Sequence, residues 1–142
     1  MAEASKTVEM TVPRDKLWET IIDYAKYPEF VDGAQKVKIL SREAGKARVE
    51  YGIQLLSKDI TYTLDHFEQG PGGMRWELVD SNILKANSGS WTLKDVGGGR
   101  TEVTYSLALD FKIYVPGMIL NGLVKSSLPK MLDSFEKRTK SR

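Results

Sequence analysis

The 142-residue chain is long enough for one domain with a single core, and we expect residues 1–142 to form that domain. Its net charge of +2 and pI near 8.7 exclude the dense Lys/Arg surplus of a dedicated nucleic-acid-binding protein, and we expect no DNA partner. Because it contains no cysteine, it has no disulfide, thiolate nucleophile or Cys-based metal site.

The first residues lack the apolar segment of a secretory signal, and no stretch approaches the length of a membrane-spanning helix. We therefore expect a soluble, cytoplasmic protein. The sequence is also compatible with contact at the cytosolic face of a membrane.

The N-terminal part of the chain predicts one strand and two short helices. Residues 5–12 alternate apolar and polar side chains, which is typical of a strand. Pro13 favours a helix start, and Pro28 interrupts the helical pattern, so a second short helical turn ending at Gly33 should follow. The apolar residues of the first helix form a stripe that predicts its buried side: Leu17, Trp18, Ile21, Ile22 and Ala25.

Residues 34–111 show a period of two almost throughout, which predicts about six antiparallel strands joined by short turns. The turn residues are concentrated at 43–45, 70–73 and 97–99. The phases of the strands place several aromatic residues on one inner face: Tyr51, Tyr62, Trp76, Trp91 and Tyr105.

Residues 114–142 predict a long amphipathic helix, kinked at Pro129. Its apolar stripe consists of Leu120, Val124, Leu128, Met131 and Phe135. Such a helix needs a partner, and the apolar face of the sheet is the surface that fits it. We therefore predict an α+β fold in which a curved antiparallel sheet, with its first and last strands paired, wraps around the C-terminal helix.

Small residues in the long helix and aromatic residues on the inner face of the sheet together suggest a hydrophobic pocket. The small residues are Gly117, Gly122, Ser126 and Ser127. Ordinary core filling is the alternative for each aromatic residue taken singly.

The sequence predicts neither catalytic residues nor a metal site. His66 is the sole histidine, and a lone histidine near a strand end is more often an edge or satisfied polar residue than a general base. The acidic residues of the strand region fall mostly at turns or on outward phases. A cyclase that shapes its substrate with Tyr51, Tyr62, Tyr105 and Arg75 remains an alternative.

Three segments carry a resemblance to a known family: residues 12–18, residues 23–30 with their Tyr27-Pro28-Glu29-Phe30 motif, and Gly89-Ser90-Trp91. Together with the order of elements, they resemble the START-like helix-grip (SRPBCC) superfamily. Within it, the polyketide cyclase/dehydrase-like group that includes the coenzyme Q-binding proteins is most similar. The resemblance implies a hydrophobic ligand held between the sheet and the long helix.

The function that this resemblance implies is binding and transport or chaperoning of a quinone, polyprenyl or other lipid, with no cofactor beyond that ligand. An aromatic polyketide cyclase and a ribosome-associated toxin-like module are the alternatives. The residues expected to bind the ligand are Tyr27, Phe30, Tyr51, Ile53, Tyr62, Leu64, Trp76, Leu78, Trp91, Tyr105, Leu107, Leu109, Met118, Gly122 and Ser126.

The end of the chain is basic. The cations Lys125, Lys130, Lys137, Arg138, Lys140 and Arg142 outnumber Asp133 and Glu136. They suit a solvated helix C-terminus. They also suit transient contact with anionic lipid headgroups or with ribosomal phosphates.

Overall fold

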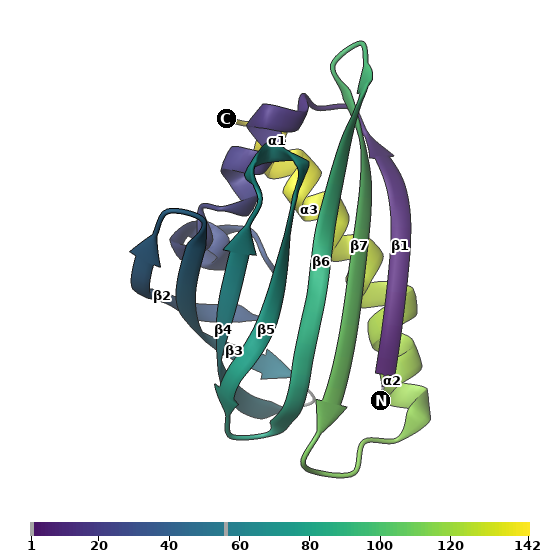
Figure 1. Cartoon of the computed structure of the whole chain (residues 1–142). Helices are drawn as coiled ribbons and strands as arrows, with labels where there is room; N and C mark the ends of the chain where they lie inside the picture. The colour runs from purple at the N-terminus through teal and green to yellow at the C-terminus, as the bar shows by residue number, and fades with distance from the viewer. Residues whose placement is uncertain (1, 56) are drawn as a thin grey trace.

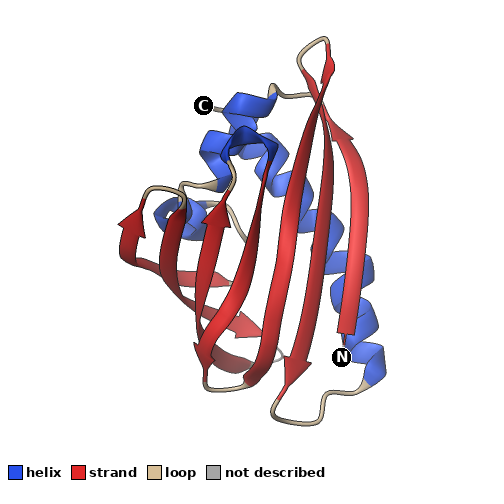
Figure 2. Cartoon of the chain, in the orientation of Figure 1, coloured by secondary structure: helices blue, strands red, loops and turns tan. Residues whose placement is uncertain are grey.

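A computed structural model describes residues 2–55 and 57–142 (Figure 1). It confirms the predicted α+β architecture, in which a curved antiparallel sheet lies against a long C-terminal helical region (Figure 2). The elements follow in the order β1 (Ala2–Met10), α1 (Arg14–Ile21), the 3₁₀-helix η1 (Tyr24–Glu29), β2 (Ala34–Glu43), β3 (Lys46–Leu55), β4 (Lys58–Glu68), the 3₁₀-turn η2 (Gly70–Gly72), β5 (Gly73–Ser81), β6 (Leu84–Gly97), β7 (Arg100–Phe111), α2 (Gly117–Gly122), the π-helical turn η3 (Leu123–Ser127) and α3 (Leu128–Lys140).

The sheet has seven strands in the order β1-β7-β6-β5-β4-β3-β2 within the described residues. The predicted pairing of the first strand with the last is confirmed: β1 runs antiparallel to β7, from Ala2 opposite Leu109 to Met10 opposite Thr101. The remaining strands follow as a meander, because each is joined to its neighbour by a short turn. The sheet curves around one side of the C-terminal helix (Figure 1).

The N-terminal elements differ from the prediction at their ends. β1 starts at Ala2 and ends at Met10, before the predicted limit of residue 12, because its pairing with β7 runs over that range.

The buried stripe predicted for the first helix does not reach Ala25. Ala25 is exposed, whereas its neighbour Tyr24 is fully buried. The tighter winding of η1 changes the rotation per residue, so the buried side of α1 does not continue at the spacing of an α-helix.

The long C-terminal helix is interrupted ahead of its proline, and the kink expected at Pro129 stays a prediction. The π-helical turn η3 lies between α2 and α3, and Pro129 occupies the first turn of α3. Proline has no N–H to donate to the preceding turn, which interrupts the regular hydrogen-bond ladder at that point. Leu128 and Phe135 of the predicted stripe are buried and Met131 is half-buried, while the side chain of Val124 lies outside the described residues.

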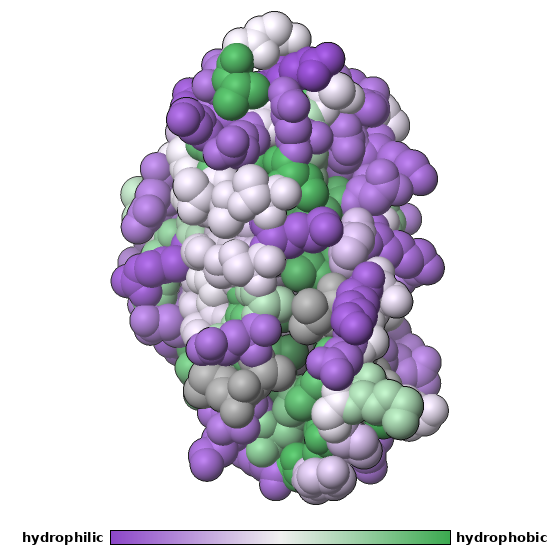
Figure 3. Space-filling view, turned by 90° about the vertical axis from the view of Figure 1, so that its right-hand side faces the viewer, coloured by the Kyte–Doolittle hydropathy of each residue, from purple (hydrophilic) through white to green (hydrophobic). Residues whose placement is uncertain are grey.

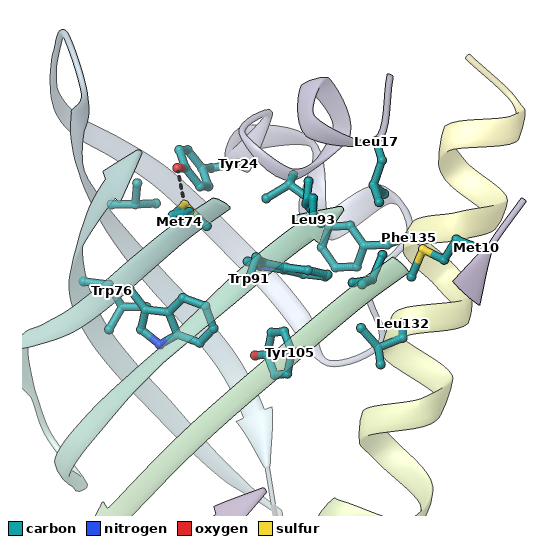
Figure 4. Close-up of a cluster of buried hydrophobic side chains, with 14 of the residues drawn as sticks. Met10, Leu17, Tyr24, Met74, Trp76, Trp91, Leu93, Tyr105, Leu132 and Phe135 are labelled. Atoms are coloured by element: carbon teal, nitrogen blue, oxygen red, sulfur yellow. Dashed lines mark hydrogen bonds between the residues drawn. The ribbon is translucent and has the colours of Figure 1, made fainter. Parts of the chain in front are cut away.

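The close-packed core lies where α1 and α3 meet the sheet (Figure 4). Side chains from β1, α1, β6, β7 and α3 fill it, among them Met10, Leu17, Leu93, Val103 and Leu132, each at most 3% exposed. Thr139 on α3 donates a hydrogen bond to Thr20 on α1 at 2.9 Å between the two hydroxyl oxygens. This end of the molecule is therefore filled by the protein's own side chains.

Gly89 on β6 sets the position of a large aromatic ring. A Cβ at this residue would lie 2.2 Å from the carbonyl oxygen of Ser106 and 2.4 Å from the indole of Trp76. Only a residue without a side chain lets the indole lie flat against the strand. This contact holds Trp76 over the concave face of the sheet.

None of the described helices is both long and apolar enough to cross a membrane. The apolar residues that stand out on the surface include a group around α2: Ile113, Tyr114, Met118 and Ile119. Figure 3 shows apolar surface at the height that α2 occupies in Figure 1.

Candidate functional site

A cavity of about 450 Å³ lies between the concave face of the sheet and the C-terminal helix. Its wall consists mainly of aromatic and aliphatic side chains from β3 to β7. Residues from η1, the segment after it, η3 and α3 complete the wall. The lining residues are Tyr27, Val31, Asp32, Gly33, Ala34, Tyr51, Ile53, Gln54, Ile60, Tyr62, Leu64, His66, Trp76, Leu84, Asn87, Trp91, Tyr105, Leu107, Leu109, Ser127, Met131 and Phe135.

The aromatic residues of the wall contact one another in a continuous series. Tyr51 and Tyr62, opposite each other on β3 and β4, stack with ring centroids 5.0 Å apart. On the other side, Trp91 meets Tyr105 at 4.9 Å and Phe135 of α3 at 5.0 Å, both edge to face (Figure 4). These contacts join the sheet to the helix.

His66 is a buried polar residue in this wall, with 4% of its surface exposed. Its Nε2 lies 2.7 Å from the hydroxyl oxygen of Tyr51, and its ring stacks on Tyr24 at 4.5 Å. Burial lowers the pKa of His66 to about 3, because the imidazolium would lose its hydration, so the ring is neutral at physiological pH. Its Nδ1 is buried and has no hydrogen-bond partner among the described residues.

From the sequence, His66 is expected to be an edge residue or a satisfied polar group rather than a general base. The structure puts it inside the sheet, since β4 lies between β3 and β5, and satisfies only one of its two nitrogens. The pairing with Tyr51 depends on two strands being in register, so the sequence of β4 alone contains no signal for it.

Asn87 is a second buried polar residue in the wall, and sequence reasoning missed it. The indole Nε1 of Trp76 donates a hydrogen bond to Asn87 Oδ1 at 3.0 Å, and Asn87 is 7% exposed. The apolar alternation of this strand is clear only from Gly89 onward, whereas β6 starts at Leu84. Had the strand been extended backward, the inward phase of Asn87, two residues before Gly89, would have been the signal.

The hydroxyl groups of Tyr62 and Tyr105 complete the polar part of the wall. Burial raises the pKa of both phenols, so each keeps its proton and can donate a hydrogen bond. Neither hydroxyl has a hydrogen-bond partner within residues 2–55 and 57–142, and both residues line the cavity.

The sequence matches one family model over residues 10–136, that of "Polyketide cyclase / dehydrase and lipid transport". The chain belongs to this family. The match spans the cavity wall from β3 to α3, so the residues described above lie within the part of the chain that defines membership.

Solved structures share the fold of this polyketide cyclase/dehydrase family member at low sequence identity. A START superfamily protein from Mycobacterium smegmatis superposes with a TM-score of 0.87 and 17% identity, covering 98% of this chain and 97% of that one. The Zhui aromatase/cyclase from Streptomyces sp. R1128 gives 0.85 and 17% over 99% and 94%. TTHA0849 from Thermus thermophilus gives 0.83 and 15% over 98% and 97%. No curated protein matches the sequence significantly.

The structure of this family member brings together ten of the residues that the sequence predicted for the pocket. They are Tyr27, Tyr51, Ile53, Tyr62, Leu64, Trp76, Trp91, Tyr105, Leu107 and Leu109. All except Tyr27 come from the sheet, where the alternation of side chains identifies the inner face directly. Whether they contact a ligand stays a prediction.

The other five predicted residues lie outside the cavity wall. Phe30 packs edge to face on Phe135, with ring centroids 5.1 Å apart, and Leu78 is half-buried against the core. Met118 is 84% exposed, and Gly122 is also exposed, since no residue of α2 is buried.

Ser126 is exposed as well, and its neighbour Ser127 lines the cavity instead. The π-helical turn η3 places both residues, and its wider winding shifts the side that faces the sheet relative to an α-helix.

Charged groups are nearly absent from the wall. Asp32 is the one charged residue that lines the described part of the cavity, and it pairs with Lys130 at 2.6 Å in an exposed position. Arg75, considered above for a cyclase, points to the other side of the sheet, where its guanidinium pairs with Glu77 at 2.9 Å and lies 4.0 Å from the ring centroid of Phe67. Within the described residues, no three His, Asp or Glu side chains gather where they could hold a metal ion.

Proposed function

We propose that this protein binds and carries a hydrophobic small molecule, such as a quinone, a polyprenyl compound or another lipid, in the cavity between sheet and helix. The observation that carries the proposal is the cavity itself, about 450 Å³ in volume and walled mainly by aromatic and aliphatic side chains. Volumes of this size and walls of this composition are typical of sites for small ligands. The family description, which names lipid transport, supports the same function.

The wall favours an apolar ligand energetically. Transfer of apolar surface from water contributes roughly 25 cal/mol per Å². The rings of Tyr51 and Tyr62 stack, and Trp91 meets Phe135 edge to face, so these parts of the wall are formed before a ligand binds. Membership of the coenzyme Q-binding subgroup is part of this proposal.

The experiment that tests the proposal uses freshly purified protein. Native mass spectrometry and organic extraction should detect a co-purifying apolar compound, and added quinones or lipids should raise the melting temperature. Leu109→Trp, which fills the cavity from β7, should abolish the thermal shift, whereas Val79→Trp on the exposed part of β5 should leave it unchanged. Absence of both a bound compound and a thermal shift in the unmodified protein would refute the proposal.

An aromatic polyketide cyclase is a second candidate. The hydrogen bond between Tyr51 and His66 supports it, because a phenol and an imidazole in the cavity wall are groups that can orient a bound polyketide through hydrogen bonds. The family description and the aromatase/cyclase of the same fold support it too. Incubation with a linear poly-β-ketone should then yield a cyclised product that Tyr51→Phe no longer forms.

A further inference from the structure

The entrance to the cavity is marked by those lining residues that remain exposed. Among the described lining residues, these are Asp32, Gly33, Gln54 and Ser127, whereas the others are buried or half-buried. Gly33 and Gln54 are neighbours in space, because the Gln54 N–H donates to the carbonyl oxygen of Gly33 at 3.1 Å. Ser127 on η3 lies one helical turn before Lys130, the ion-pair partner of Asp32. The entrance therefore lies between the turn of residues 30–33 and the C-terminal helical region.

An ion pair spans this entrance. Lys130 Nζ, on the first turn of α3, lies 2.6 Å from Asp32 Oδ2. The two side chains are 70% and 73% exposed, so the pair lies at the surface. Their chain neighbours Met131 and Val31 are half-buried and line the cavity. The pair thus connects one rim of the entrance to the other.

Side chains alone join the turn of residues 30–33 to α3 in the described part of the chain. The backbone hydrogen bonds of the turn lead to η1, to the start of β2 and to β3. Phe30 packs on Phe135, with ring centroids 5.1 Å apart. Phe135 lies more than one helical turn beyond Lys130, so this contact is separate from the ion pair. The entrance can therefore widen at Asp32 without loss of a backbone hydrogen bond or of the contact at Phe30.

The helical side of the entrance makes few packing contacts. α2 buries none of its residues, and η3 is a single π-helical turn, a winding that occurs mostly at functional sites. In α3 the first buried residue is Leu128, and the next, Leu132, lies beyond Lys130. The ion pair therefore fastens the helix close to the point where its packing against the sheet begins.

We infer that the Asp32–Lys130 pair is a latch on the cavity: the entrance widens when the pair breaks and closes when the pair forms again. An exposed ion pair is individually weak and is screened by salt, so it breaks and forms readily. The inference goes beyond the proposed function, because it concerns access to the cavity whatever occupies it.

The lack of cysteine allows a test without a ligand. Leu64→Cys places a single thiol deep in the cavity wall, where the leucine is 5% exposed. The small uncharged reagent 4,4′-dithiodipyridine can reach this thiol through the entrance, and its reaction releases a coloured thione that absorption measures. Val103→Cys places the thiol in the close-packed core instead, where it reacts only on unfolding.

The two thiols should differ in rate. The Leu64→Cys protein should react about tenfold faster than the Val103→Cys protein, since opening at the entrance requires less than global unfolding. Equal rates would mean that the cavity is reached only by unfolding, which would overturn the inference.

Variants of the pair test the latch in the Leu64→Cys background. Asp32→Asn and Lys130→Met each remove one charge and keep most of the side-chain volume. Each should speed the reaction by about two- to fivefold, as the strength of an exposed ion pair requires. The double variant should add nothing further, because either replacement already breaks the pair.

A matched control lies on the same helix. Lys137→Met breaks an exposed pair with Asp133, 2.9 Å away within α3, and should leave the reaction rate unchanged. Unchanged rates in both Asp32→Asn and Lys130→Met, or an equal increase in Lys137→Met, would overturn the inference. So would an equal increase at the Val103→Cys thiol, which would attribute the effect to global unfolding.

Salt tests the intact pair. Raising NaCl from about 0.05 to 0.5 M should speed the reaction of the Leu64→Cys protein about twofold, because salt screens exposed charges. The same protein with Lys130→Met should show no such increase, and an equal increase in both would overturn the inference. Since no ligand takes part, these results do not depend on whether the cavity carries an apolar compound.

Discussion

The imidazole of His66 titrates near neutral pH in unfolded chains, but in the folded protein it is buried among nonpolar side chains. Burial lowers its pKa in the folded protein to about 3, from an ordinary value of 6.5. Below pH 6.5 the unfolded chain therefore binds a proton that the folded chain does not. By linkage, the contribution of His66 to the free energy of unfolding is fully present above this pH and is lost as the pH falls.

We predict that the free energy of unfolding falls by about 2 kcal/mol between pH 7.5 and pH 5 because of His66. The carboxyls whose pKa is lowered by their partners, Asp65 through Arg48 and Glu29 through Arg138, titrate below this window. Urea denaturation at both pH values measures the difference. His66→Phe should lose most of the pH dependence whatever its own stability, and an equal loss in both proteins would contradict the prediction.

At the scale of elements, the two halves of the C-terminal helix differ in how they meet the sheet. α3 buries Leu128, Leu132, Phe135 and Thr139, whereas α2 buries none of its residues. The ring of Phe135 packs against those of Tyr27, Phe30 and Trp91, with 5.0 to 5.3 Å between ring centroids. α3 is therefore the part of the helix that fixes it to the molecule.

We predict that Phe135→Ala lowers the free energy of unfolding by about 3–5 kcal/mol, since it opens a void between α3 and three aromatic rings. Met118→Ala on α2 should change it by less than about 0.5 kcal/mol, because that side chain is 84% exposed. Chemical denaturation measures both values. Hydrogen exchange should also be faster at the amides of α2 than at those of α3, and a large effect at Met118 would argue that α2 packs against the sheet.

At the scale of the whole molecule, ion pairs connect the basic C-terminus to the rest of the chain. Arg138 pairs with Glu29 at 2.6 Å and Arg142 with Asp23 at 3.5 Å, which ties the end of α3 to the N-terminal helical region. Lys137 and Lys140 pair with Asp133 and Glu136 one helical turn earlier. These pairs leave less positive charge for a partner than the sequence suggests.

Contact with a membrane surface or a ribosome stays a prediction. If the C-terminus binds phosphates, the protein should sediment together with ribosomal subunits or anionic vesicles. This co-sedimentation should be weak at physiological salt and fall steeply as salt is raised. Lys137→Glu with Lys140→Glu should abolish it, whereas Lys36→Glu with Lys38→Glu on β2 should not. Equal sedimentation of the two double variants would exclude the C-terminus as the contact.

Much of the fold and part of the cavity follow from local patterns in the sequence. The period of two predicted the strands and placed Tyr51, Tyr62 and Trp76 on one face, because successive side chains of a strand point to opposite sides. The stripe that includes Leu128 and Phe135 predicted a helix with one buried side. These features depend on neighbours a few residues apart.

Only the tertiary structure decided which inner residues fill the core and which border the cavity, because that depends on how α3 lies across strands distant in sequence. Because of the winding of η3, Ser127 lines the cavity where Ser126 was expected. Phe30 and Leu78, also expected in the wall, pack against the core instead. The tertiary structure also paired His66 with Tyr51 and Trp76 with Asn87, since hydrogen bonds across a sheet depend on register. The sequence by itself determined an aromatic inner face, and the assembled sheet and helix decided where that face stays open and which polar groups line the opening.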